Sequence, residues 1–111
     1  MGRGGHLGEL EALVLTAVVR VGQGANGTAV YGEIEERSGR DASLPAIHVT
    51  LRRLEDKGLL TSAMGDPSPR GGRPRRYYRP TADGVRALRE FRAMWRSVWR
   101  GLELPDPETL S

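Results

Sequence analysis

The chain has 111 residues, no cysteine and a formal net charge of +3 at pH 7. This length fits one domain with a modest core, so a large exposed apolar face would indicate association with another chain. The lack of cysteine excludes disulfides, thiolate metal sites and cysteine nucleophiles, and without a signal peptide or an apolar run of roughly 18 to 20 residues we expect a cytoplasmic protein with no membrane partner.

The basic charge is concentrated in the second half of the chain. Residues 62–100 carry ten arginines against three acids, whereas residues 1–61 are close to neutral and residues 101–111 carry three acids. Arginine binds phosphate oxygens and guanine edges through paired hydrogen bonds, which suits a nucleic-acid partner. An arginine bias can also reflect the base composition of a genome, so this signal decides little by itself.

Two helices are expected in the first third of the chain. Apolar residues at helical spacing predict a helix over 7–21, and the glycine-rich run at 22–27 ends it. The predicted buried stripe consists of Leu10, Leu13, Val14, Ala17, Val18 and Val21, with Glu9, Glu11 and Arg20 off it. Asn26 or Thr28 can cap a second helix over 28–38, with Ala29, Val30 and Ile34 buried. Its acidic end indicates a supporting element that does not face a phosphate backbone.

A third helix begins after Ser43, a suitable N-cap, and ends before Gly58. Pro45 falls in its first turn, where the missing N–H is harmless. Its buried stripe is predicted to be Leu44, Ile47, Leu51 and Leu54. The opposite face is small, polar and cationic, as a DNA major groove can accept, so we assign this as the recognition helix. With Ser43, its predicted DNA contacts are Ala46, His48, Val49, Arg52 and Arg53.

Two short strands, over 59–64 and 75–79, are expected to form a hairpin. The connecting sequence GDPSPRGGRP contains glycines and prolines that continue neither a helix nor a strand. This hairpin, the wing, has the densest positive charge in the chain, and its predicted DNA contacts are Arg70, Arg73, Arg75, Arg76, Tyr77 and Tyr78. The alternative is a solvated loop kept soluble by its charge.

The last helix is predicted to start after Thr81 as N-cap and to run to about Arg100. Large apolar side chains near heptad spacing predict a dimer interface of Leu88, Phe91, Trp95, Val98, Trp99 and Leu102. A neighbouring row of arginines is equally consistent with a solvated helix face. The segment from Glu103 onward contains two prolines and three acids and is expected to fray.

These elements predict an α+β, mostly α, winged helix-turn-helix. We expect a DNA-binding domain over 1–81, a dimerisation helix over 82–102 and a flexible acidic tail over 103–111. No catalytic constellation or metal-ligand cluster is visible in the sequence, so we expect neither an enzyme nor a cofactor or metal. Two classes stay open: a homodimeric regulator that binds double-stranded DNA, and a winged-helix module that binds another protein. The polar, cationic face with His48, Arg52 and Arg53 favours the first.

Three segments resemble the PadR family of bacterial winged-helix transcriptional regulators, in its short branch with one C-terminal helix. They are LGELEALVLTAV, SLPAIHVTLRRLEDKGLL and GDPSPRGGRPRRYYRPTADG, and the resemblance extends from Leu7 to about Leu102. It implies a winged helix that dimerises through its last helix and binds an operator, usually as a repressor. Some short members bind planar, often cationic compounds between the two C-terminal helices, which implies for Trp95 the role of a stacking surface for an effector.

The chain departs from the family pattern at three positions. Asn26 stands where an aromatic residue is usual, and His48 stands where the recognition helix usually has tyrosine. His48 can therefore offer a ring nitrogen to DNA or lie on the helix surface without a partner. Pro80 replaces a strand residue such as leucine, which implies an early end to the second strand.

Overall fold

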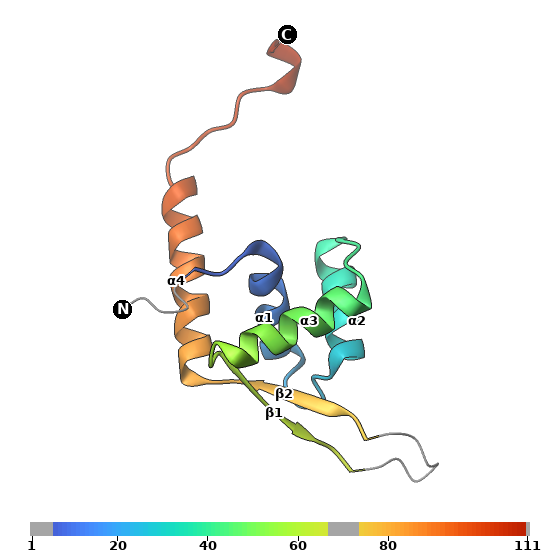
Figure 1. The fold of residues 1–111 in the computed structure, drawn as a ribbon. Coiled ribbons are helices and arrows are strands. Elements are labelled where there is room, and N and C mark those ends of the chain that lie inside the picture. The colour runs from blue at the N-terminus through green and yellow to red at the C-terminus, as the bar shows by residue number, and fades with distance from the viewer. Residues whose placement is uncertain (1–5, 67–73, 111) are drawn as a thin grey trace.

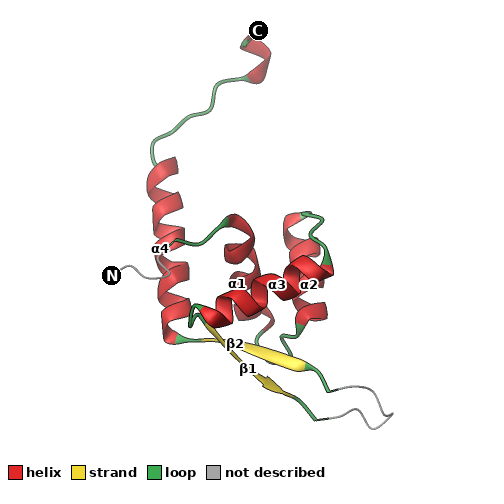
Figure 2. Cartoon of the chain, viewed as in Figure 1, coloured by secondary structure: helices red, strands yellow, loops and turns green. Residues whose placement is uncertain are grey.

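The structure is a computed structural model that describes residues 6–66 and 74–110 (Figure 1). Within these residues, four α-helices and one two-stranded antiparallel sheet make up the fold, with a short 3-10 helix near the C-terminus (Figure 2). The elements are α1 (Glu9–Val21), α2 (Gly27–Ser38), α3 (Leu44–Asp56), β1 (Leu60–Met64), β2 (Arg76–Pro80), α4 (Ala82–Trp99) and η1 (Pro107–Thr109). The predicted mostly helical winged-helix fold is thereby confirmed.

Short polar side chains begin three of the four α-helices of the described residues. The side-chain oxygens of Asn26, Ser43 and Thr81 accept backbone N–H groups three residues on, at 2.8, 3.2 and 3.0 Å. Each bond satisfies one of the N–H groups that a helix start leaves without an intrahelical partner. Of the two residues considered as the cap of α2, Asn26 therefore has this role.

The core lies where α1, α2 and α3 meet the base of the wing. Its largest fully buried side chains include Leu15, Ile47, Leu51, Leu54 and Leu60. Leu15 was absent from the predicted stripe of α1, whereas three members of that stripe, Leu10, Leu13 and Val21, are only partly buried. The difference arises because α1 packs against α2, α3, β2 and α4, so its buried surface is wider than one stripe.

Glu11 was predicted to lie off the buried side of α1, and this was wrong. The residue is 8% exposed, and its carboxylate accepts a hydrogen bond from Lys57 Nζ at 2.8 Å and another from the Gly8 N–H at 3.0 Å. Burial acts to raise the pKa of the Glu11 carboxyl, but the bonds from Lys57 and Gly8 outweigh it and leave this pKa below its usual value. The pair joins the start of α1 to the end of α3.

Three smaller predictions also differ from the structure. Leu44, expected in the buried stripe of α3, is 36% exposed at the helix start, while Thr50 is buried and donates its hydroxyl to the Ala46 carbonyl at 2.8 Å. Ala29, expected to be buried, is half-buried. Pro80 does not shorten β2, which runs through this residue and pairs it with Leu60. Proline is tolerated at this end of the strand because the ladder needs no N–H from it.

A tight junction holds the start of α4 against the start of β1. The Thr81 hydroxyl donates to the Gly58 carbonyl at 2.7 Å, and the Thr81 N–H donates to the Leu59 carbonyl at 3.1 Å. Gly84 lies so close to this strand that an added Cβ would be 2.2 Å from the Leu59 carbonyl oxygen. The direction of α4 is therefore set by backbone contacts.

The helix α4 ends within one residue of the predicted end near Arg100, but the dimerisation helix expected over 82–102 is too long. The helix ends at Trp99, and Gly101 turns the chain with φ +75°, so Leu102 of the predicted interface lies beyond the helix. The following segment points away from the rest of the chain and ends in η1 (Figure 1). That this segment frays stays a prediction.

The Glu11–Lys57 pair predicts a pH-dependent contribution to stability. We expect Glu11→Gln to lower the free energy of unfolding at pH 7 by about 1.5 kcal/mol, because it removes hydrogen bonds to a buried charge. The depressed pKa means that this contribution is present above the ordinary carboxyl value of 4.5 and is lost as the pH falls through the lower pKa of the folded state. Urea unfolding between pH 7 and pH 3 measures this pH-dependent contribution.

The control is Glu9→Gln. The Glu9 side chain is 81% exposed and pairs with Arg40 at 3.3 Å, so this substitution should change the free energy of unfolding little. Equal stability of Glu11→Gln and the original chain at pH 7 would contradict the assignment.

The junction at Gly84 predicts a strong effect of one methyl group. Gly84→Ala should lower the free energy of unfolding by about 1 to 3 kcal/mol, because the new Cβ meets the Leu59 carbonyl and the backbone must shift. Gly32→Ala is the matched control, since a Cβ at this helical glycine has no neighbour within 4 Å, and it should be neutral or stabilising. Thermal unfolding of both variants separates the two outcomes, and similar midpoints would show that the junction is not tight.

Candidate nucleic-acid interface

The face of α3 opposite the core is polar, cationic and open to solvent. Ile47, Leu51 and Leu54 are fully buried and fix the orientation of the helix. This leaves the predicted contact residues on the outer side, of which Ser43, His48, Val49, Arg52 and Arg53 are exposed and Ala46 is half-buried. Ser43 Oγ is engaged as the cap of the helix, and the charge of Arg53 acts on the Glu11 carboxyl.

His48 has a packing partner that the sequence did not indicate. A Cβ built at Gly27 would lie 2.3 Å from His48 Cε1, so the imidazole lies directly on the backbone of the first turn of α2. His48 is thus an exposed residue of the helix surface whose ring packs on α2, and its contact with DNA stays a prediction. The contact depends on glycine at position 27, because any side chain there would displace the ring.

A cavity of about 440 Å³ lies beside this contact. It is lined by Asn26, Gly27, Thr28, His48, Pro74, Arg75, Arg76 and Tyr78. The start of α2 directs free N–H groups and the positive end of the helix dipole toward this region, and two arginines add positive charge. Such an arrangement can bind an anionic oxygen, including that of a phosphate. The acidic residues of α2 lie toward its other end, away from this turn. That the helix does not face a phosphate backbone stays a prediction.

The described part of the wing combines exposed arginines with two tyrosines in different environments. Arg75 and Arg76 are exposed, and Arg76 Nη1 donates to Ser62 Oγ at 3.0 Å. Ser62 in turn donates to Glu55 Oε2 at 2.8 Å, which ties β2 to the end of α3. Arg70 and Arg73, also predicted to contact DNA, lie outside the described residues.

Tyr77 and Tyr78 separate into a surface residue and a core residue. Tyr77 is half-buried over Gly65, where an added Cβ would lie 2.5 Å from its ring. Tyr78 is only 7% exposed, and its N–H donates to the Ala25 carbonyl at 2.9 Å. Burial raises the pKa of the Tyr78 hydroxyl, and the nearby Arg76 charge offsets this only in part. Tyr78 thus belongs to the core but also lines the cavity beside His48, and its predicted DNA contact stays a prediction.

The outer face of α4 is apolar and exposed. Trp95, Val98 and Trp99 are 46, 58 and 49% exposed, and the ring of Trp95 meets Phe91 edge-on with centroids 6.3 Å apart. Leu88 and Phe91 are half-buried. The predicted interface residues within the helix thus form one surface that is open to solvent. Such a large exposed apolar surface is unusual for a small domain.

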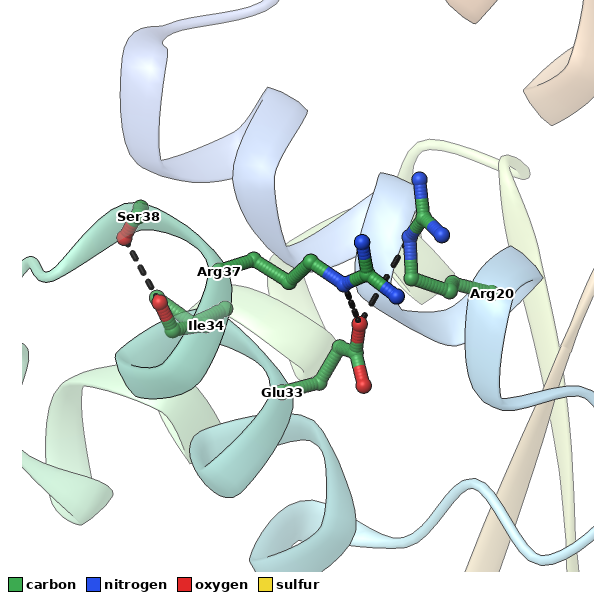
Figure 3. A network of polar contacts seen from close by, with 5 residues as sticks. All are labelled: Arg20, Glu33, Ile34, Arg37 and Ser38. Carbon is green, nitrogen blue, oxygen red and sulfur yellow. Dashed lines mark hydrogen bonds and ion pairs between the residues drawn. The ribbon is translucent and has the colours of Figure 1, made fainter.

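Two cavities flank this surface. The first, of about 650 Å³, lies between α1, α2 and α4, and we call it the α2-side cavity. Charged residues line its edge, where Glu33 pairs with Arg20 at 3.5 Å and with Arg37 at 3.0 Å (Figure 3). The second, of about 600 Å³, lies between α1 and α4, and we call it the arginine-rimmed groove. Trp95 lines both.

A comparison with protein-family models decides the family. Residues 14–90 match the model described as the transcriptional regulator PadR-like family. This chain belongs to the PadR-like family. Members of this family are transcription regulators and not enzymes, and its winged helix binds DNA. The resemblance inferred from the three sequence segments is confirmed.

Solved structures with the same fold include further members of the PadR family. A PadR family transcription regulator from Clostridium difficile R20291 aligns with a TM-score of 0.71 at 24% identity, covering 82% of this chain and 91% of that chain. A PadR family transcriptional regulator from Eggerthella lenta DSM 2243 aligns with a TM-score of 0.67 at 32% identity, covering 84% and 81%. F93 from STIV, a winged-helix DNA-binding protein, aligns with a TM-score of 0.64 at 17% identity, covering 83% and 92%. No curated protein sequence matches the chain.

Metal-binding groups and membrane-spanning helices were sought in residues 6–66 and 74–110. Among them, no group of three or more His, Asp or Glu side chains is arranged to hold a metal ion. No helix in this part of the chain combines the length and the apolar composition of a bilayer crossing. That the PadR-like protein works without a cofactor stays a prediction.

The contact between His48 and Gly27 can be tested with a double-mutant cycle. We expect Gly27→Ala to destabilise the chain by about 1 kcal/mol, because the methyl group displaces the imidazole. In a His48→Ala background the same change should be nearly neutral, since no ring remains to be displaced. Denaturant unfolding of the four proteins measures the coupling, and strictly additive effects would show that the two residues do not touch.

Proposed function

We propose that this PadR-like protein is a cytoplasmic, homodimeric regulator, acting as a repressor, that recognises an inverted-repeat operator. The observation that carries the proposal is the exposed cationic face of α3 beside the positively charged wing and the start of α2. In a winged helix, this helix enters the major groove while the wing follows the backbone or the minor groove.

The contacts divide into base readout and backbone positioning. Ala46, His48, Val49 and Arg52 read base edges, because they stand on the exposed side of α3. The first turn of α2, together with Arg75 and Arg76, binds a phosphate in the cavity beside His48. Ser43 and Arg53 lie at the two ends of the recognition helix and add backbone contacts. Arg70, Arg73 and Tyr77 belong to the wing contacts, while Tyr78 supports them from the core.

A homodimer is supported by the open apolar face of α4. Trp95, Val98 and Trp99 are each about half exposed, and covering them with the same face of a second copy removes them from water. A two-fold dimer presents two recognition helices to successive major grooves, so the half-sites should be about 10 bp apart between centres. One recognition helix and one wing make a small contact surface, and the second copy doubles it.

An effector is the remaining element of the proposal. Trp95 borders both cavities and exposes about half of its surface, 46%, so its indole face can stack on a planar apolar or cationic compound. Binding there changes the packing of α4, and the spacing of the two recognition helices follows from that packing. A compound that binds the free dimer more tightly than it binds the DNA-bound dimer would release the operator.

The operator proposal predicts a symmetric, salt-dependent DNA site. Selection from a random DNA pool at two salt concentrations should return an inverted repeat, and binding to it should weaken with salt at a log-log slope of about −0.9 per phosphate contact. Arg52→Ala should lower affinity for the selected site by about tenfold and relax preference at one position in each half-site.

The matched control is Arg37→Ala, which removes an arginine that pairs with Glu33 at the opposite end of α2 from the phosphate cavity. This variant should bind the selected site as the original chain does. A footprint over one half-site, or affinity that does not change between low and moderate salt, would overturn the proposal. Size exclusion distinguishes it from a protein-interaction module, which predicts a monomer in the pure protein.

A further inference from the structure

We propose that the C-terminal segment, residues 101–110, of one copy docks in the arginine-rimmed groove between α1 and α4 of a second copy. The proposal rests on the homodimer proposed above and adds to the α4 contact a second contact, made by the chain beyond the helix. Three properties carry it: the exposed leucines of the segment, its acidic charge and the basic rim of the groove.

The segment has the composition of a docking peptide. Leu102, Leu104 and Leu110 are 53, 67 and 63% exposed, so the chain holds three large apolar side chains in water. The acids Glu103, Asp106 and Glu108 lie between these leucines in the segment. Exposure of these leucines to water is unfavourable, and docking would bury them.

The far end of the segment already has a defined shape. Asp106 Oδ1 accepts the Glu108 N–H at 3.0 Å, and the Thr109 hydroxyl donates to the Asp106 carbonyl at 2.7 Å, which together hold η1. A segment with internal hydrogen bonds loses less conformational entropy when it docks than a fully flexible one.

The arginine-rimmed groove complements this composition. Its basic rim is formed by Arg89 and Arg92, and its apolar surface by Val19, Val85, Leu88, Phe91 and Trp95. The last three also belong to the proposed α4 interface, so the segment would continue that interface along the groove. None of the described residues that line it is acidic. Within residues 6–66 and 74–110, neither arginine takes part in an ion pair. The groove therefore offers apolar contacts to the leucines and two positive charges to the acids.

The α2-side cavity fits this segment less well. It is slightly larger, but its edge includes the acids Glu9 and Glu33, and Glu33 already pairs with Arg20 and Arg37 (Figure 3). An acidic segment would be repelled by these carboxylates, whereas the arginine-rimmed groove has no such charge among its described residues.

The direction of α4 favours docking on a second copy. The helix has 18 residues and is about 27 Å long, with the groove along residues 85–95 and the segment leaving its far end. The segment continues away from its own groove (Figure 1). Two α4 helices packed antiparallel about a two-fold axis bring the end of one beside the start of the other. Ten extended residues reach about 33 Å, which is enough to follow the partner's groove.

Disulfide trapping tests the contact directly, because the natural chain contains no cysteine. Leu104→Cys and Val19→Cys are made in separate full-length chains, mixed and oxidised. We expect a mixed disulfide between the two variants, identified by its mass. Docking should bring the two Cα atoms within the roughly 4.4 to 6.8 Å that a disulfide usually spans. Leu104→Cys mixed with Thr61→Cys, an exposed position on β1, is the control and should give only background.

A second measurement covers the energetics. Removal of residues 102–111 should leave the helicity of the domain unchanged but raise the dimer dissociation constant by about tenfold or more, since tenfold already corresponds to the burial of roughly one leucine. Arg89→Ala with Arg92→Ala should act in the same direction, while Arg96→Ala with Arg100→Ala, which alters exposed arginines outside the groove, should not.

The outcomes separate this inference from the homodimer itself. A stable dimer that forms no mixed disulfide above background and is unaffected by truncation overturns the docking and leaves the proposed dimer standing. A protein that is monomeric at all concentrations by sedimentation overturns both. A mixed disulfide together with a weaker truncated dimer supports the docking.

Discussion

The close backbone contact between the start of α4 and the start of β1 fixes the orientation of α4 relative to the recognition helix α3. Gly84 leaves no room for a side chain against the Leu59 carbonyl, and Thr81 bonds both Leu59 and Gly58. The same residues connect α3 to the wing, so the recognition helix and α4 are joined through a few rigid backbone contacts. In the proposed homodimer, the packing of α4 against the second copy would be coupled to the direction of α3 through these contacts.

The DNA-facing side is assembled from parts of the chain that are distant in sequence. His48 of α3 rests on Gly27 of α2, and both border a cavity whose other wall is the start of β2 with Arg75 and Arg76. A helix N-terminus, an imidazole and two guanidinium groups converge there, although none of them alone would make an anion site. The usual tyrosine of the family would be larger than His48, and Gly27 is the residue that leaves the ring its space.

The α4 side has the opposite chemistry. Its indole and aliphatic side chains are about half exposed, and the two cavities beside it differ in charge, since one includes acids and the other is rimmed by arginine. In the proposed dimer, the apolar surface sets where the second copy associates, and charge sets which cavity the acidic segment prefers. The residues proposed to contact DNA and the apolar surface of α4 thus lie on different elements, so the proposed DNA binding and the proposed dimer use different residues.

Local signals in the sequence determined the elements of this PadR-like protein. Asn26, Ser43 and Thr81 are caps recognisable from a few neighbouring residues, and the 3.6-residue period predicted α3 and α4 within a few residues of their ends. The glycines and prolines between the two strand segments predicted the hairpin for the same reason. Each of these features depends on side chains within about one helical turn or one tight turn of each other.

Only the tertiary structure decided which side chains meet. Glu11 is charged and was predicted to lie off the buried side, but Lys57, 46 residues away, allows it to be buried. Tyr78 and Tyr77 are adjacent and chemically alike, yet only the pleat of β2 and its contact with Ala25 determine that Tyr78 is the one in the core. The contact of His48 with Gly27 likewise follows from packing. The spacing of apolar residues predicts which face of a helix or strand is buried, whereas the residues that pack against this face depend on the whole chain.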